Sequence, residues 1–288
     1  MAVPLGPAAP VPVPPASVDL SPSALPCVLV TRPQPQADEW VARLQALGLQ
    51  AGALPLLGIS APADVGPVRA AWQQLVHLPT VFDVVMLVSP SAVERFFAQR
   101  PAGSAWPPQV IAAGTGPGTR RALLQAGVPE PAVVTPPEAA GQFDSEALWG
   151  VLGSRLHWPG RSVLVVRGEG GRDWLADTLR QHGAALHFVE AYRRTAPVPD
   201  AAGLALLQQA LAQPEAHCWL FSSSEAVGHL PALAPAARWA DASALASHPR
   251  IAEAARSLGF GRVLQVAPSP EAVAAALRAA WPAGPAVA

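Results

Sequence analysis

VLVTR at residues 28–32 recurs as VLVVR at residues 163–167, and LVSPSAV at residues 87–93 recurs as FSSSEAV at residues 221–227. Both repeats have nearly the same offset, about 135 residues. Solenoid repeats run at roughly 20–50 residues, so this offset fits the size of a whole domain. The repeat therefore predicts two similar α/β lobes facing each other across a cleft.

Strand-like and helix-like patterns alternate in both copies. The apolar run 28–30 is followed by apolar positions 40, 41, 44 and 47 at helical spacing, and Gly48 then ends the helix. Residues 49–57 are predicted to form the next strand. In the second copy the run 163–166 precedes a helix over 173–181 and a strand over 185–192. This order predicts doubly wound, flavodoxin-like or Rossmann-like parallel sheets, which bind ligands at the carboxyl ends of their strands.

Composition sets the broad class. With 288 residues, 51% of them hydrophobic and 14% charged, the chain is long and apolar enough to fill two cores. No stretch is apolar for long enough to predict a membrane span. We expect residues 1–26, rich in Ala and Pro, to be a disordered tail, and residues 282–288 to be a short C-terminal tail. Cys27 and Cys218 lie in apolar runs, so we expect them to pack as free thiols in a reducing cytoplasm.

Several classes of chemistry are disfavoured. A net charge of −1 does not provide the basic surface that nucleic acid needs. The chain has no lysine, which rules out a P-loop lysine or a Schiff-base lysine. The seven histidines and two cysteines show no metal-ligand spacing, so no metal site is predicted.

The predicted strand-to-helix loops indicate the kind of ligand. Each loop leads into a helix N-terminus, where free N–H groups favour carboxylates or phosphates. The glycine loops at 114–118 and 168–171 lack the third glycine of a dinucleotide motif. The serines at 222–224 lack the G-x-S-x-G pattern of a hydrolase. An anionic small molecule is therefore expected, without a nucleotide.

Eight short motifs together resemble one family. They are VTRP at 30–33, VSPSAV at 88–93, GPGT at 116–119, DSE at 144–146, VRGEGGRDWL at 166–175, AYRR at 191–194, SSEAV at 223–227 and HPRIAE at 248–253. No single motif is specific, but in this order and spacing they resemble the uroporphyrinogen-III synthases. The resemblance spans about residues 27–281.

The resemblance implies a fold and a reaction. The family has two lobes joined by a two-stranded ladder, which maps here to 54–59 against 189–194. Lobe 1 maps to 27–54 plus 191–281, and lobe 2 to 55–190. The family closes hydroxymethylbilane, a linear tetrapyrrole polycarboxylate, into a ring with inversion of the terminal pyrrole and loss of water. It uses no metal or organic cofactor, and a monomer that binds neither nucleic acid nor membrane is expected.

The resemblance also suggests site residues. Tyr192, the only tyrosine, matches the family's hinge tyrosine and is our candidate proton donor for loss of the hydroxyl; the alternative is an aromatic that only orders the hinge. Thr119 is expected either to bind a substrate carboxylate or to cap its helix. Four arginines are candidates for pairing with substrate carboxylates: Arg32, Arg167, Arg172 and Arg250. The other candidate substrate-binding residues are Thr31, Ser89, Pro90, Ser91, Gly116, Gly118, Gly168, Gly170, Ser222, Ser223, Ser224 and His248.

Two other residue groups are assigned no role. The pair Arg193-Arg194 follows the ladder and is predicted to be solvated, and none of the nine tryptophans is assigned to the ligand.

Two other functions also remain open at this point. One is a bilobed enzyme like a glycosyltransferase, and the other is a non-catalytic bilobed sensor of an anionic small molecule.

Overall fold

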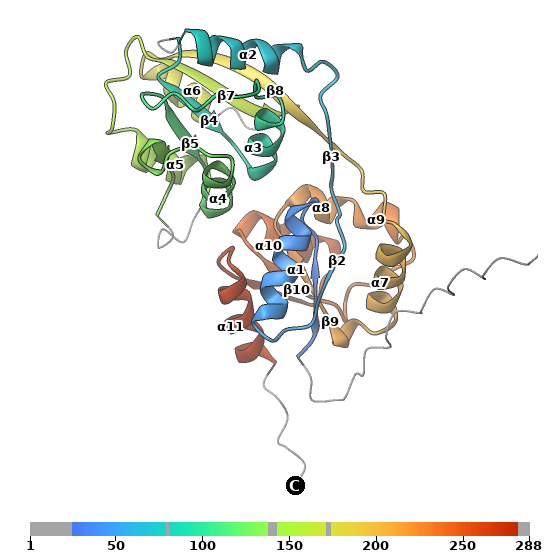
Figure 1. Cartoon of the computed structure of the whole chain (residues 1–288). Helices are drawn as coiled ribbons and strands as arrows, with labels where there is room; N and C mark the ends of the chain where they lie inside the picture. Colours follow the sequence, from blue (N-terminus) through green and yellow to red (C-terminus); the bar gives the residue numbers. More distant parts are fainter. Residues whose placement is uncertain (1–24, 79–80, 138–142, 171–173, 282–288) are drawn as a thin grey trace, which may run out of the picture.

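The computed structural model describes residues 25–78, 81–137, 143–170 and 174–281. Most of the predicted tail 1–26, and all of 282–288, lie outside the described residues. The described strands form two sheets, and helices pack on both faces of each (Figure 1). A mixed α/β fold with parallel sheets was predicted, and it is confirmed.

The first sheet has five parallel strands in the order β11-β10-β9-β1-β2. The strands are β1 (Cys27–Val30), β2 (Ala51–Ala53), β9 (His217–Phe221), β10 (Ser243–Ala246) and β11 (Arg262–Gln265). We call this sheet and the helices packed on it the five-stranded half. It joins the beginning of the chain to its C-terminal third.

The second sheet has six strands in the order β3-β8-β7-β4-β5-β6, all parallel except β3. The strands are β3 (Gly58–Ser60), β4 (Val84–Leu87), β5 (Ile111–Gly114), β6 (Val133–Val134), β7 (Ser162–Gly168) and β8 (Ala185–Thr195). We call this sheet and its helices the six-stranded half. The long strand β8 runs from this half toward the other (Figure 1).

The two sheets have the same spatial order but different chain connections. The order β2-β1-β9-β10-β11 corresponds strand by strand to β8-β7-β4-β5-β6, so the sequence repeat matches β1 with β7 and β9 with β4. In the five-stranded half the strand order reverses between β1 and β9, and in the six-stranded half between β4 and β7. Ligands of parallel sheets bind at such switch points, outside the carboxyl ends of the strands.

Alternation along the strands supplies each sheet with two apolar faces. In β4, Val85 and Leu87 pack against α2 (Gly66–His77), α3 (Pro90–Phe97) and α4 (Pro117–Gln125). The residues between them, Val84 and Met86, pack against α5 (Ser145–Leu152) and α6 (Trp174–Gln181). Successive strand side chains point to opposite faces, so helices on both faces are needed to bury them.

The five-stranded half is built in the same way. One face of its sheet packs against α1 (Gln36–Ala46) and α11 (Pro270–Ala280). The other packs against α7 (Ala201–Ala212), α8 (Ser224–Gly228), α9 (Leu230–Leu233) and α10 (Pro249–Leu258). Short 3₁₀ helices lie at Glu130–Ala132 and Pro214–Ala216. Cys27 and Cys218 are free thiols on the paired strands β1 and β9, and burial raises their pKa values to about 11 and about 12.

The glycine after α1 ends that helix as predicted. Gly48 has a φ of 78°, and Gly259, after α10, has a φ of 104°. Both values lie in the left-handed region that glycine enters without steric cost. The helix starts also follow the sequence, because Ser89 caps α3 by accepting the N–H of Ala92 at 3.1 Å.

The strand contact near the connection between the halves is shorter than predicted. Only Gly58, Ile59 and Ser60 pair antiparallel with β8, opposite residues 193–195. The apolar run 49–57 contributes only β2 to a sheet, because Leu54 and Leu56 are fully buried in the core of the five-stranded half. Within the described ranges, no helix is both long and apolar enough to cross a lipid bilayer.

Candidate active site

A cavity of about 520 Å³ lies where the carboxyl ends of the strands of both sheets meet. From the five-stranded half it is lined by residues that follow β1, β9 and β10. From the six-stranded half it is lined by residues that follow β4 and β5 and by the ends of β7 and β8. Both switch points therefore open onto the same space, which is where a parallel α/β sheet binds its ligand.

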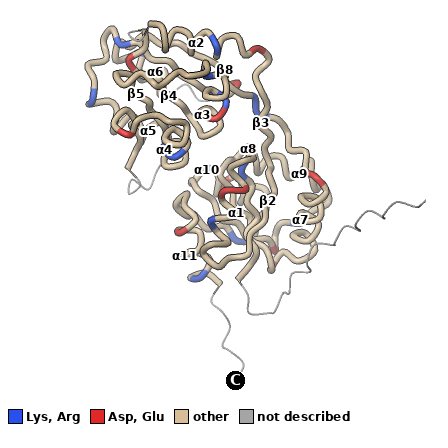
Figure 2. The backbone as a smooth tube through the Cα atoms, viewed as in Figure 1, with Lys and Arg blue, Asp and Glu red and all other residues tan. Residues whose placement is uncertain are grey.

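The described lining is strongly basic. It contains five arginines, Arg32, Arg121, Arg167, Arg194 and Arg250, and a single carboxylate, Asp144. Figure 2 shows basic positions on α4 and near α8, where the two halves approach each other, and an acidic segment between α8 and α1. Two of these arginines pair with carboxylates that lie outside the lining, Arg121 with Glu39 and Arg194 with Glu225, so part of this positive charge is already balanced. Such a cavity attracts and holds a multiply negative ligand.

Among the described elements, five helices begin at the cavity: α3, α4, α5, α8 and α10, of which α5 is capped by the side chain of Asp144. The lining includes Ser89 at the start of α3, Gly116 at the start of α4 and His248 at the start of α10. The first N–H groups of a helix lack intrahelical partners, and the helix dipole places partial positive charge there. The backbone therefore reinforces the arginines in favouring carboxylates.

Arg32 lies between this cavity and a second one of about 330 Å³ bordered by α1, α3 and α4. Its guanidinium carbon lies 4.3 Å from the ring centre of Trp40, so the indole supports the cation from one side. Burial, and secondarily the charge of Arg121, lowers the pKa of Arg32 to about 10. Among the described residues it has no ion-pair partner. The guanidinium is therefore held in place with its charge uncompensated.

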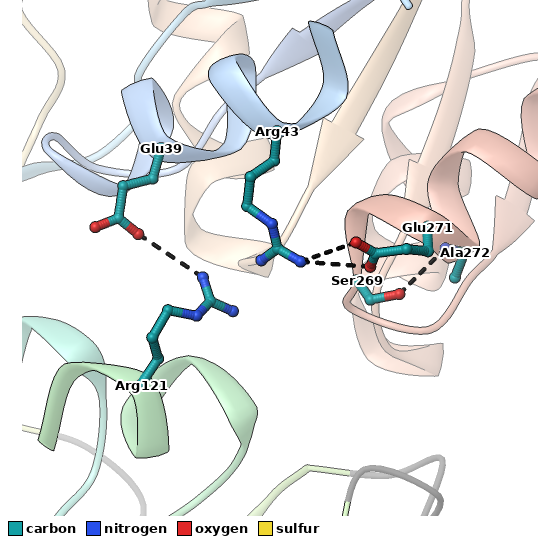
Figure 3. A network of polar contacts seen from close by, with 6 residues as sticks. All are labelled: Glu39, Arg43, Arg121, Ser269, Glu271 and Ala272. Atoms are coloured by element: carbon teal, nitrogen blue, oxygen red, sulfur yellow. Dashed lines mark hydrogen bonds and ion pairs between the residues drawn. The ribbon is translucent and has the colours of Figure 1, made fainter. Parts of the chain in front are cut away.

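Contacts between the halves border the second cavity. The amide Nε2 of Gln36 on α1 donates to Ser91 Oγ on α3 at 3.0 Å. A carboxylate oxygen of Glu39 on α1 lies 3.8 Å from a guanidinium nitrogen of Arg121 on α4 (Figure 3). Burial raises the pKa of Glu94, which also lines this space. The bond between Gln36 and Ser91 is buried, whereas the pair of Glu39 and Arg121 is partly exposed and so contributes little to holding the halves together.

Tyr192 is buried, with 4% of its surface exposed, and its phenol oxygen lies 3.1 Å from Ser89 Oγ. A bulge between β7 and β8 sets its direction, because Arg167 pairs with Glu190 whereas Gly168 pairs with Tyr192. The extra residue, Ala191, lets two successive side chains of β8 face the protein interior. The ring lies against Gly168, where a Cβ atom would come within 2.7 Å of the ring carbons Cε2 and Cζ.

Thr119, on the first turn of α4, is almost fully buried, with 2% of its surface exposed, yet it lines the cavity. Its hydroxyl caps nothing, since the residue before α4 is Gly116 and no side-chain capping bond is present there. Its methyl group lies where a side chain at Gly114 would stand. Of the two roles expected for Thr119, this arrangement favours binding over capping.

His248 and Asp144 approach each other from opposite halves. The ring atom Nδ1 of His248 accepts the N–H of Arg250 at 3.2 Å, so Nε2 faces Asp144 Oδ2 at 3.7 Å. Asp144 also accepts the N–H of Ala147 at 2.9 Å and so caps α5. Among the residues that the structure describes, no group of three or more His, Cys, Asp or Glu side chains is arranged to hold a metal ion.

Most of the residues singled out from the sequence line the cavity. They are Arg32, Ser89, Pro90, Gly116, Gly118, Thr119, Arg167, Gly168, Gly170, Tyr192, Ser222, Ser223, Ser224, His248 and Arg250. Two others are turned away from it. The hydroxyl of Thr31 donates to the carbonyl oxygen of Leu220 at 2.8 Å, and Ser91 accepts from Gln36. Arg172 lies outside the described residues.

Several lining residues were not singled out from the sequence, among them Trp40, Arg121, Asp144 and Arg194. Arg194 was expected to be solvated, but its guanidinium pairs with Glu225 of the other half at 2.9 Å and it lines the cavity. Arg121 lies one turn into α4, at a position that the motifs do not mark. A signal was available for Asp144, because the DSE motif at 144–146 contains it.

Comparison with known proteins identifies the family. The family model described as Uroporphyrinogen-III synthase HemD matches residues 38–275. A uroporphyrinogen-III synthase of Escherichia coli K12 is 34% identical over 188 residues, which cover 64% of this chain and 71% of that protein. One of Salmonella typhimurium LT2 is 33% identical over 187 residues, covering 61% and 68%.

Solved structures show the same fold. A mutant uroporphyrinogen III synthase of Thermus thermophilus superposes with a TM-score of 0.50 at 20% identity, covering 88% of this chain and 98% of that one. The uroporphyrinogen-III synthetase of Helicobacter pylori 26695 gives a TM-score of 0.52 at 13% identity, covering 89% and 99%. Taken with the sequence matches, which extend over most of both sheets, these likenesses mean that the chain belongs to the uroporphyrinogen-III synthase family.

Proposed function

We propose that this chain closes hydroxymethylbilane into a macrocycle, with inversion of the terminal pyrrole and loss of water, in the cavity between its two sheets. The observation that carries the proposal is the lining itself: five arginines and the N-termini of five helices surround one space that contains a single described carboxylate. A linear tetrapyrrole with acetate and propionate arms is a polyanion of the kind such a lining binds.

The cavity explains how binding selects one product. Hydroxymethylbilane also cyclises unaided to the uninverted isomer, so the protein must hold the chain in the one posture that leads to inversion. Guanidinium groups bind carboxylates with two parallel hydrogen bonds, which fixes direction as well as position. Arginines on several different loops therefore fix several arms of one flexible substrate, and orientation supplies much of the rate enhancement.

We assign the chemical step to Tyr192. Its phenol proton passes to the substrate hydroxyl, the C–O bond breaks, and the bonding pair leaves with the oxygen as water. The lone pair of the adjacent pyrrole nitrogen stabilises the electron-deficient methylene carbon, which gives an azafulvene-type cation. The substituted carbon of the terminal pyrrole then attacks this methylene carbon. After the spiro intermediate fragments and recloses, the last pyrrole carbon loses its proton to the phenolate, which restores Tyr192. Burial of Tyr192 beside the cavity supports this role.

We also propose that the two halves are separate lobes that move relative to each other. The proposed lobes are 27–54 plus 191–281, and 55–190, so the boundary lies within β8, and residues 191–195 of the six-stranded sheet belong to the first lobe. A volume of about 520 Å³ lies within the roughly 300–1,000 Å³ range for drug-sized ligands, and a tetrapyrrole polyacid is larger than those. The described polar contacts between the halves are single hydrogen bonds or ion pairs: Gln36–Ser91 is buried, and Glu39–Arg121 and Arg194–Glu225 are partly exposed, so each adds only modestly to the cost of opening. Such hinge motion is a common way to admit and enclose a substrate.

The protein is proposed to act as a monomer, as the resemblance to the family implies. The thiols of Cys27 and Cys218 are free, which fits a protein working in a reducing cytoplasm. No organic cofactor or metal takes part in the proposed steps. A glycosyltransferase-like enzyme or a sensor is not favoured, since no observation in the structure points to a nucleotide and the family match points to the synthases.

The test is product analysis. Purified protein is incubated with freshly generated hydroxymethylbilane, the products are oxidised, and the uroporphyrin isomers are separated. Type III product formed faster than the uncatalysed type I background is expected, and type I product alone contradicts the proposal. Tyr192→Phe keeps the ring and its packing, so it is expected to fold normally and to lower the type III rate by about 100-fold or more. An unchanged rate contradicts the role given to Tyr192.

A further inference from the structure

Ser89 is the polar side chain next to the phenol oxygen of Tyr192, and the sequence had pointed to it as a substrate contact. It lies two residues after the end of β4 and directly before α3, so a strand and a helix of the six-stranded half fix its position. Its Oγ atom lies 3.1 Å from the phenol oxygen, and the same Oγ accepts the backbone N–H of Ala92 at 3.1 Å. The serine is thus held on two sides.

The direction of the hydrogen bond between the two hydroxyls decides where the phenol proton lies. A serine hydroxyl has one hydrogen to donate and two lone pairs to accept with. The bond from Ala92 uses one lone pair and leaves the serine hydrogen available. If Ser89 donates to Tyr192, the phenol hydrogen is free to point into the cavity. If Tyr192 donates to Ser89, its proton is held away from the substrate.

We infer that Ser89 is the positioning residue of Tyr192: its hydroxyl donates to the phenol oxygen and leaves the phenol proton aimed into the cavity. This inference rests on the proposed function, in which Tyr192 gives that proton to the leaving hydroxyl. Ser89 itself transfers no proton and forms no covalent bond. It acts on the reaction through Tyr192 and makes no substrate contact of its own in this assignment.

Events after the proton transfer favour the same direction. Once the proton has left, the phenolate oxygen can only accept hydrogen bonds, and the serine hydroxyl 3.1 Å away is a donor already in place. Bonds to charged groups are stronger than neutral ones. Ser89 also stands at the N-terminus of α3, whose dipole favours negative charge there. Both effects act on the charged form, so they stabilise the state that follows proton transfer more than the state before it.

The experiment compares Ser89 variants with a matched helix cap elsewhere. Ser89→Ala removes the hydroxyl donor and also the cap of α3. Ser269 precedes a proline in the same way, caps α11 by accepting the N–H of Ala272 at 3.1 Å, and does not line the cavity (Figure 3). Ser269→Ala therefore removes the same kind of cap without touching Tyr192. Both variants are expected to lose stability to a similar extent.

Of these two alanine variants, only Ser89→Ala is expected to lose catalytic rate. Its kcat for type III product should fall by about 10- to 100-fold, the size expected for loss of a hydrogen bond to a charged group, while KM changes little. Ser89→Gly keeps an acceptable helix cap and should be nearly as slow as the alanine variant. Ser89→Thr keeps the hydroxyl and should recover most of the rate. Loss of affinity without loss of kcat overturns the inference, because that result indicates direct substrate binding.

The double variant separates this inference from the proposed function. In the Tyr192→Phe background the serine has no phenol oxygen to position, so adding Ser89→Ala is expected to lower kcat no further. Independent, multiplying losses overturn the inference while leaving the role of Tyr192 intact. If wild-type protein forms no type III product, the proposed function itself fails. If Tyr192→Phe retains the full rate, the role of Tyr192 and this inference fail together.

Discussion

Gly168 provides the sharpest test of the site geometry, through the substitution Gly168→Ala. A Cβ atom there would lie 2.7 Å from ring atoms Cε2 and Cζ of Tyr192, whereas carbon atoms pack at about 3.5–4.0 Å. The ring or the strand must therefore move by about 1 Å. Gly168 does not have a positive φ, so alanine is compatible with its backbone and the effect comes from the ring contact.

The expected cost has two parts. Overpacking in a buried contact destabilises by about 1–3 kcal/mol, which thermal and chemical unfolding measure. A shift of about 1 Å in a reacting group lowers kcat by about 100-fold, measured as the initial rate of type III product formation. In the Tyr192→Phe background, where Cε2 and Cζ remain, the stability cost should persist while the rate loss should not increase.

Gly150→Ala is the matched control. Gly150 lies within α5 and has no atom within 4 Å of an added Cβ. The unfolded chain has less conformational entropy with alanine than with glycine at this position, and the helix accepts alanine. Gly150→Ala is therefore expected to stabilise the folded protein by about 0.4–1 kcal/mol and to leave activity unchanged. Gly168→Ala protein with wild-type stability and wild-type kcat refutes the reasoning, because the phenol ring cannot then lie against Gly168.

Three further changes test the charges and the core. Burial lowers the pKa of Arg32 in the folded protein, so its charge reduces folding stability in full at every pH below about 10. Arg32→Met removes this charge, so the variant should melt at a higher temperature at pH 7 and show a KM raised about tenfold. An unchanged KM contradicts substrate binding by Arg32. Burial raises the pKa of Glu94 in the folded protein, so its ionisation lowers folding stability as pH rises above about 4.3. Glu94→Gln should therefore be more stable than wild type at pH 7 and equally stable below about pH 4. Equal melting temperatures of the two proteins at both pH values contradict this expectation. Trp72→Ala empties a fully buried site whose N–H donates to the Phe96 carbonyl at 2.7 Å, so denaturation should show a loss of about 3–5 kcal/mol, and a loss under about 1 kcal/mol contradicts the packing.

The elements themselves were predictable from local patterns. Apolar runs such as 163–166 became strands because both faces of a parallel sheet are buried. The glycines after α1 and α10 ended their helices because left-handed backbone is costly for other residues. The repeat at an offset of about 135 residues corresponds to two sheets of identical spatial order. Each of these signals depends on residues close together in the chain.

The extent of the connection between the halves depended on tertiary packing. Residues 49–57 read as one apolar strand, yet only Ala51–Ala53 pairs with β1. Leu54 and Leu56 are instead held by backbone bonds to the carbonyl oxygens of Val30 and Thr31, with their side chains in the core. Apolar character predicts burial, but it does not distinguish a strand from a buried loop.

By itself, the sequence determined the α/β class, the order of strands and helices and the loops that line the site, because periodicity and capping are local properties of the chain. Tertiary structure alone decided which polar groups reach the cavity. The hydroxyls of Thr31 and Ser91 form internal hydrogen bonds, Arg194 lies at the cavity, and a one-residue bulge directs Tyr192 inward. A side chain's direction there follows from strand register and from how the two halves meet, and both are set by contacts between residues far apart in the chain.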